Sequence, residues 1–109
     1  MITYSKAIEI IQESCDSLYK GGLIDSKVII DEETHILGGK SVFDSIGFIT
    51  LFSEIEDNLL EKTNSEMFLV LDEISEFDIN SPFLSVGIIA SYIVALTKEN
   101  NWTIAKSLQ

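Results

Sequence analysis

The sequence contains no arginine and only seven lysines, against 18 aspartates and glutamates, for a formal net charge of -11. Because proteins hold nucleic-acid phosphates with lysine and arginine, this charge all but excludes nucleic-acid binding and disfavours an anionic membrane surface. With 46% hydrophobic residues, the chain does not have the composition of a disordered acidic tail. The 109 residues therefore predict one globular domain with a single core and an acidic surface.

Cysteine, histidine and proline each occur once, as Cys15, His35 and Pro82. A lone cysteine forms no internal disulfide, and the first residues show no basic stretch followed by an apolar one, so we expect a cytoplasmic protein. A single histidine without a cysteine pair or a patterned acidic set predicts no metal site, and we interpret His35 as structural or exposed. The longest apolar run, residues 83–96, is too short to insert across a membrane and predicts a core helix.

The sequence also contains no convincing catalytic set, so we do not expect an enzyme. Gly38-Gly39-Lys40-Ser41 lacks the earlier glycine of a phosphate-binding loop and does not follow a convincing strand. Cys15 falls on the predicted core stripe of the first helix, where a reactive thiol is not expected.

The N-terminal part predicts a helix over residues 3–19 followed by a long loop. The apolar residues of this helix recur at three- and four-residue steps: Ile8, Ile11, Cys15 and Leu18. Gly21-Gly22 ends the helix, because glycine accepts the left-handed conformation found after many helices. Residues 23–43 show short apolar clusters without a helical period, which predicts a loop that packs across the helices.

Asp44-Ser45 opens the second and clearest helix, and either residue is a suitable N-cap. The apolar stripe of this helix consists of Phe48, Phe52, Ile55 and Leu59. The opposite side is polar and consists of Thr50, Ser53, Glu54, Asp57 and Glu61.

A short third helix is predicted at 72–79, although residues 68–71 also fit a strand. The last helix follows Pro82, with Ser81 or Ser85 as its cap. Its apolar stripe consists of Val86, Ile89, Ile93 and Leu96. We interpret residues 1–98 as the domain and residues 99–109 as a C-terminal extension, either frayed or one more turn of helix.

Acidic residues are concentrated between residues 44 and 82, where ten acids accompany a single base, Lys62. Any solvated helix face carries charge, and for one helix this plain explanation stays open. A face built only for solubility usually mixes both signs, with lysine at four-residue spacing. The one-sided charge therefore favours docking to basic surfaces of partner proteins.

The segment FDSIGFITLFSEIEDNL resembles the phosphopantetheine attachment region of acyl carrier proteins and peptidyl carrier domains. Asp44-Ser45-Ile46 stands in the register of the family's Asp-Ser-Leu at the start of the second helix. The likeness covers about residues 8–96, including the loop stretch DEETHIL and, in the last helix, Ser85-Val86 and Tyr92-Ile93. The sequence departs from the family at Phe43, where a small residue is usual, and at Ile46, which replaces leucine.

The resemblance implies an all-α, acyl-carrier-like bundle of three longer helices and one short one. It also implies a 4'-phosphopantetheine arm, delivered from coenzyme A to Ser45 by a separate magnesium-dependent phosphopantetheinyl transferase that Asp44 helps to engage. The terminal thiol of the arm would hold an acyl or aminoacyl group as a thioester. The chain would then be a discrete carrier in fatty acid, polyketide or nonribosomal peptide biosynthesis.

Further partners implied by the resemblance are an acyl- or aminoacyl-activating ligase and acyltransferases or synthases with basic docking patches. The residues expected to dock them are Ile46, Ile49, Thr50, Ser53, Glu54, Asp57 and Glu61. Core packing is the alternative for the two isoleucines, and a plain helix cap is the alternative for Asp44-Ser45. A second hypothesis is an unmodified, carrier-like interaction module, which Phe43 would favour by crowding the attachment site. A monomer is the default for so charged a domain.

Overall fold

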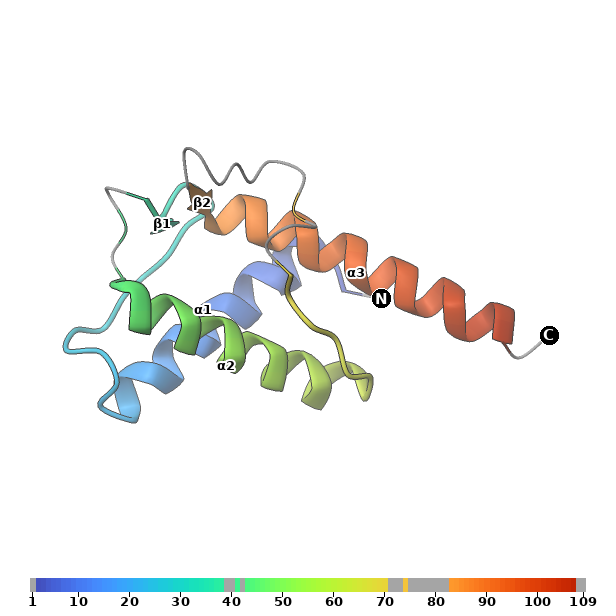
Figure 1. The fold of residues 1–109 in the computed structure, drawn as a ribbon, viewed down its shortest axis with the longest axis horizontal. Coiled ribbons are helices and arrows are strands. Elements are labelled where there is room, and N and C mark those ends of the chain that lie inside the picture. The colour runs from blue at the N-terminus through green and yellow to red at the C-terminus, as the bar shows by residue number, and fades with distance from the viewer. Residues whose placement is uncertain (1, 39–40, 42, 71–73, 75–82, 108–109) are drawn as a thin grey trace.

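The computed structural model describes residues 2–38, 41, 43–70, 74 and 83–107, except for the side chains of Ser45 and of residues 99–107. In this part of the chain, helices and strands follow one another as α1 (Tyr4–Lys20), β1 (His35–Leu37), α2 (Ser45–Thr63), β2 (Leu84–Ser85) and α3 (Val86–Ser107). α1 packs against both α2 and α3 (Figure 1). The fold is therefore mostly helical, as expected. The predicted short helix at 72–79 lies, apart from Ile74, outside the described residues.

α1 begins and ends within one residue of its predicted bounds. The hydroxyl oxygen of Thr3 accepts a hydrogen bond from the Lys6 amide at 3.1 Å and caps the first turn. At the other end Gly22 adopts a φ of 74°, and the Leu23 amide donates to the Leu18 carbonyl at 2.9 Å. This arrangement is a Schellman motif, in which the left-handed residue is usually glycine.

The buried surface of α1 is wider than the predicted stripe. It consists of Ala7, Ile10, Ile11, Ser14, Cys15 and Leu18, whereas the predicted Ile8 is only half-buried. Because α1 lies between two other helices, its core-facing arc covers two sides of the helix rather than one. The sequence pattern alone does not reveal how many neighbours a helix has.

α2 packs on α1 through Phe48, Leu51, Ile55 and Leu59, all buried. The prediction of Phe52 instead of Leu51 as a core residue is partly wrong: Phe52 is half-buried and its ring lies 4.5 Å from that of Phe48. Leu51 and Phe52 follow Phe48 at a three-residue and a four-residue step. Both steps continue a helical stripe, so the spacing alone does not predict which of the two is buried.

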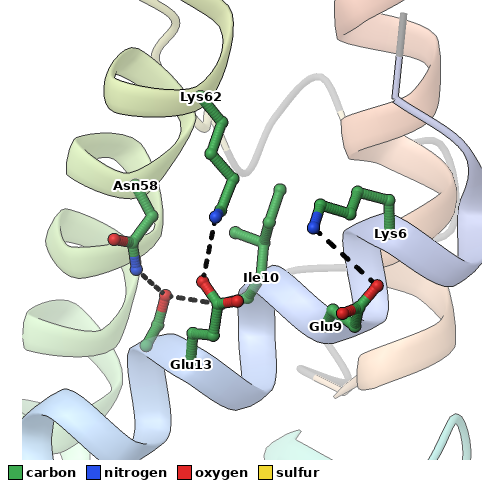
Figure 2. Close-up of polar contacts among 7 residues, drawn as sticks. Lys6, Glu9, Ile10, Glu13, Asn58 and Lys62 are labelled. Atoms are coloured by element: carbon green, nitrogen blue, oxygen red, sulfur yellow. Dashed lines mark hydrogen bonds and ion pairs between the residues drawn. The ribbon is translucent and has the colours of Figure 1, made fainter.

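Polar contacts fix α2 along α1 (Figure 2). The Asn58 amide donates to the Ser14 hydroxyl at 2.8 Å, and that hydroxyl donates to the Ile10 carbonyl at 2.8 Å. One turn further along α2, the Lys62 ammonium lies 3.2 Å from a carboxylate oxygen of Glu13. Ser14 is fully buried, so its two hydrogen bonds satisfy a group that would otherwise destabilise the interface.

The long loop packs against α1 and α3, as predicted. The side-chain amide of Gln12 donates to the Val28 carbonyl at 2.8 Å and accepts from the Ile30 amide at 2.9 Å. Further along the loop, the carbonyls of Glu32 and Thr34 accept from the Gly87 and Val86 amides, each at 2.9 Å. The loop therefore supplies acceptors for the amides at the start of α3.

The loop also contains a strand that the sequence did not predict. β1 pairs antiparallel with β2, with His35 opposite Ser85 and Leu37 opposite Leu84. The His35 ring packs edge-on against Phe83 with centroids 4.5 Å apart. Strands this short have too few residues to show an alternating pattern, and the two strands are far apart in sequence. The local sequence pattern therefore does not predict them.

α3 begins where Ser85 caps it, because the Ser85 hydroxyl accepts from the Ile88 amide at 3.3 Å. The other predicted cap, Ser81, lies outside the described residues. Val86, Ile89, Ala90 and Ile93 are buried, and the helix continues without interruption past residue 98, so that its C-terminal turns project beyond α1 and α2 (Figure 1). Among the described helices, none is long and apolar enough to cross a membrane.

After α2 the chain continues in extended form between α2 and α3. Met67 and Leu69 are buried, whereas Phe68 and Val70 are exposed. The Leu69 amide donates to the Glu56 carboxylate at 2.8 Å, and the Val70 amide donates to the Tyr92 hydroxyl at 3.1 Å. Residues 68–70 belong to no strand, so the alternative of a strand at 68–71 is not supported over the described residues.

Replacing Gln12 by alanine removes both hydrogen bonds that hold the loop near Val28 and Ile30. We expect this change to lower the free energy of unfolding by about 1–2 kcal/mol, measured by urea denaturation. Glu9→Ala, at an exposed position of the same helix, is the control and should change stability by less than about 0.5 kcal/mol. Equal stability of the Gln12 variant and the wild type would show that the loop is not held in this way.

Candidate functional site

The N-terminus of α2 carries the predicted attachment motif. Asp44 is the N-cap: it is extended, and its carboxylate accepts a hydrogen bond from the Gly47 amide at 2.6 Å. The Asp44 carbonyl accepts from the Phe48 amide at 2.9 Å, which begins the helical bonding. Ser45 is the first residue of the helix, and its side chain lies outside the described part of the structure.

Phe43 is only 8% exposed, and its side chain belongs to the core. A Cβ atom on Gly47 would lie 3.4 Å from the Phe43 ring and 3.1 Å from the capping oxygen of Asp44. Gly47 therefore leaves the space in which the ring and the cap fit together. The Phe43 ring packs inward, under the first turn of α2. Whether it crowds the attachment site stays a prediction, since the Ser45 side chain lies outside the described residues.

The predicted docking residues lie on one face of α2, opposite the face that packs on α1. Ile46 is 77% exposed and Ile49 is 64% exposed, so core packing does not explain them. The remaining members of this face are Thr50, Ser53, Glu54, Asp57 and Glu61, of which Thr50 and Glu54 are half-buried. The Thr50 hydroxyl donates to the Ile46 carbonyl at 2.7 Å. We call these seven residues, from Ile46 to Glu61, the docking face.

Two other charged residues of α2, Glu56 and Lys62, do not belong to this face and contact other parts of the chain. Glu56 accepts the Leu69 amide and holds the extended segment after the helix. Lys62, the single base between residues 44 and 82, reaches from α2 to Glu13 of α1 (Figure 2). All charged side chains of the docking face are acidic, and its two apolar residues, Ile46 and Ile49, lie at its N-terminal end.

Two surface cavities flank this face. A groove of about 500 Å³ runs along α2 between Phe48, Ile49 and Phe52 on one side and Leu69 and Val70 on the other. A second cavity, of about 250 Å³, lies beside the N-cap. One wall of this cavity comes from residues of the 23–28 segment and the other from Phe43, Asp44 and Gly47. The second cavity was not predictable from the sequence, because its walls come from a loop and a helix end that meet only in the fold.

Cys15 is buried in the core, as predicted, and burial raises the pKa of its thiol to about 12, with a smaller contribution from the neighbouring Asp16 carboxylate. The thiol therefore stays protonated and inaccessible near neutral pH. Within the described residues, no three side chains among His, Cys, Asp and Glu gather closely enough to hold a metal ion.

Comparison with known proteins found no family model, no curated protein and no solved structure that matches this chain.

Replacing Asp44 by alanine removes the carboxylate that accepts the Gly47 amide. We expect the free energy of unfolding to fall by about 1 kcal/mol, the usual cost of losing an N-cap. Asp57→Ala, at an exposed position inside the same helix, keeps the cap and is the matched control for loss of one acidic charge. If both variants unfolded at the same urea concentration, the capping role of Asp44 would be refuted.

Proposed function

We propose that this chain is a discrete carrier protein that holds an acyl or aminoacyl group on a 4'-phosphopantetheine arm attached to Ser45. We further propose that it adopts an acyl-carrier-like four-helix bundle, whose short helix at 72–79 lies, apart from Ile74, outside the described residues. The observation that carries the proposal is the position of Ser45, first in a helix that presents an exposed apolar and acidic face directly after it.

The residues at this helix end are compatible with a phosphodiester on Ser45. The first amides of a helix have no acceptor one turn back, and here the Asp44 carboxylate takes only that of Gly47. No described residue accepts the amides of Ser45 and Ile46, so they are suited to bind a phosphate, whose charge the positive end of the helix dipole favours. The Phe43 ring is buried in the core and contributes little to the surface here.

Attachment would join the Ser45 hydroxyl oxygen to the phosphorus of the phosphopantetheine group of coenzyme A. The bond to adenosine 3',5'-bisphosphate breaks, and the hydroxyl proton passes to a base of the transferase. When bound, the arm supplies a thiol that carries the cargo as a thioester. Cys15 does not compete for cargo, because its thiol is buried and protonated.

The docking face would bind the transferase, the activating ligase and the enzymes that receive the cargo. Two exposed isoleucines followed along the helix by acidic side chains complement a partner surface with a small apolar area beside a basic one. Contacts of this kind form quickly and release quickly, as a protein that visits several enzymes in the cytoplasm requires. The second hypothesis, an unmodified carrier-like interaction module, would use the same docking face and differs in that Ser45 never receives the arm.

Incubation with coenzyme A, magnesium and a broad-specificity phosphopantetheinyl transferase should add one phosphopantetheine to the wild type. Ser45→Ala should remain unmodified, because the hydroxyl is the acceptor, and intact mass spectrometry measures both results. Ser53→Ala removes an exposed serine from the same helix face and should be modified like the wild type. An unmodified wild type with two different transferases would overturn the proposal and favour the interaction module.

Asp57→Lys reverses one charge in the middle of the docking face. We expect modification by the transferase to slow by about tenfold at low ionic strength, with a smaller effect at high salt, because a surface charge acts mainly on encounter. Glu9→Lys makes the same change in net charge at an exposed position of α1. If both variants slowed equally, total charge rather than the docking face would govern binding.

A further inference from the structure

The cavity beside Asp44 lies next to the residue proposed to carry the arm. Its loop wall includes Leu23, Asp25, Ser26 and Val28, and its helix wall begins with Phe43 and Asp44. Asp44 precedes Ser45 directly, so the cavity lies one residue along the chain from the proposed attachment position. The groove along α2 lies on the other side of the helix start, against Leu69 and Val70.

The loop wall is held at both ends by contacts with α1. At one end the Leu23 amide donates to the Leu18 carbonyl at 2.9 Å. At the other, the Val28 carbonyl accepts from the Gln12 side chain at 2.8 Å. The helix wall is held by the buried ring of Phe43 and by the capping bond of Asp44. A cavity whose walls are fixed before binding loses less conformational entropy when a ligand enters.

The side chains of the cavity combine an apolar surface with hydrogen-bond acceptors. Leu23, Val28 and Phe43 supply the apolar part, whereas the carboxylates of Asp25 and Asp44 supply acceptors and negative charge. An anion would be repelled here, and a neutral group with methyls, a hydroxyl and amide N–H donors would be favoured. The phosphodiester would therefore remain at the helix amides, outside the cavity.

We infer that this cavity binds the first neutral part of the phosphopantetheine arm, with its two geminal methyls against Leu23 and Val28 and its hydroxyl and first amide toward Asp25. The inference rests on the proposed function, because it requires the arm on Ser45. At about 250 Å³ the cavity is smaller than the usual 300–1,000 Å³ of sites that enclose a whole drug-sized molecule. It therefore holds the root of the arm and leaves the thiol outside, where partner enzymes reach it.

The test is nuclear magnetic resonance of isotopically labelled protein that carries an unlabelled arm. Isotope-filtered spectra should contain cross-peaks between the geminal methyls of the arm and the methyls of Leu23 and Val28. Ser26→Phe places a ring in the cavity and should abolish these cross-peaks while the added mass remains. Ser17→Phe, at an exposed serine of α1, is the matched control and should retain them.

Leu23→Ala is a second variant, chosen because Leu23 is 64% exposed and contributes little to the core. It should reduce the cross-peaks from the arm to Val28 by at least half. A modified wild type whose arm contacts no residue of the 23–28 segment, or contacts Ile49 and Val70 instead, would overturn this inference and leave the proposed function intact. A wild type that accepts no arm would overturn both.

Discussion

The packing of α1 between α2 and α3 is the constraint on which the rest of the structure depends. Its buried residues, including the small Ala7 and Ser14, face two neighbouring helices, and each large apolar side chain buried there contributes about 1.5–3 kcal/mol. Polar contacts then fix the neighbours: Asn58 and Lys62 hold α2, and Gln12 holds the loop. Because the same helix positions the loop and α2, it also determines where the loop meets the start of α2.

The two faces of α2 differ: one packs in the core, and the other is the proposed docking face. Two charged residues of α2 contact neighbouring parts of the chain. Glu56 accepts the Leu69 amide of the segment after the helix, and Lys62 pairs with Glu13 of α1. The other face carries exposed isoleucines and only acidic charge. In the first turn of α2, a side chain at position 47 would press on the capping oxygen of Asp44 and lie against the ring of Phe43. The large residue before the Asp-Ser motif is thus accommodated in the core.

Much of the helical fold follows from local chemistry and was predictable. Thr3, Gly22, Asp44 and Ser85 end or begin helices through their own backbone and side-chain hydrogen bonds, which a sequence displays directly. Features that join distant segments were not predictable: the β1–β2 pairing, the choice of Leu51 over Phe52, and the use of Glu56 as an acceptor for Leu69. For the candidate site, the position of Ser45 and the exposed face followed from helical spacing, whereas the inward direction of Phe43 and the adjoining cavity required the fold.

The most direct test of the central claim is a count of accessible thiols in the folded protein with a chromogenic thiol reagent, before and after treatment with coenzyme A and a phosphopantetheinyl transferase. Cys15 is buried and its pKa is raised to about 12, so the untreated folded protein should show no reactive thiol, and the unfolded protein should show one. After treatment the folded protein should show one reactive thiol, the end of an arm on Ser45. A folded protein that still shows none after treatment would contradict the carrier account.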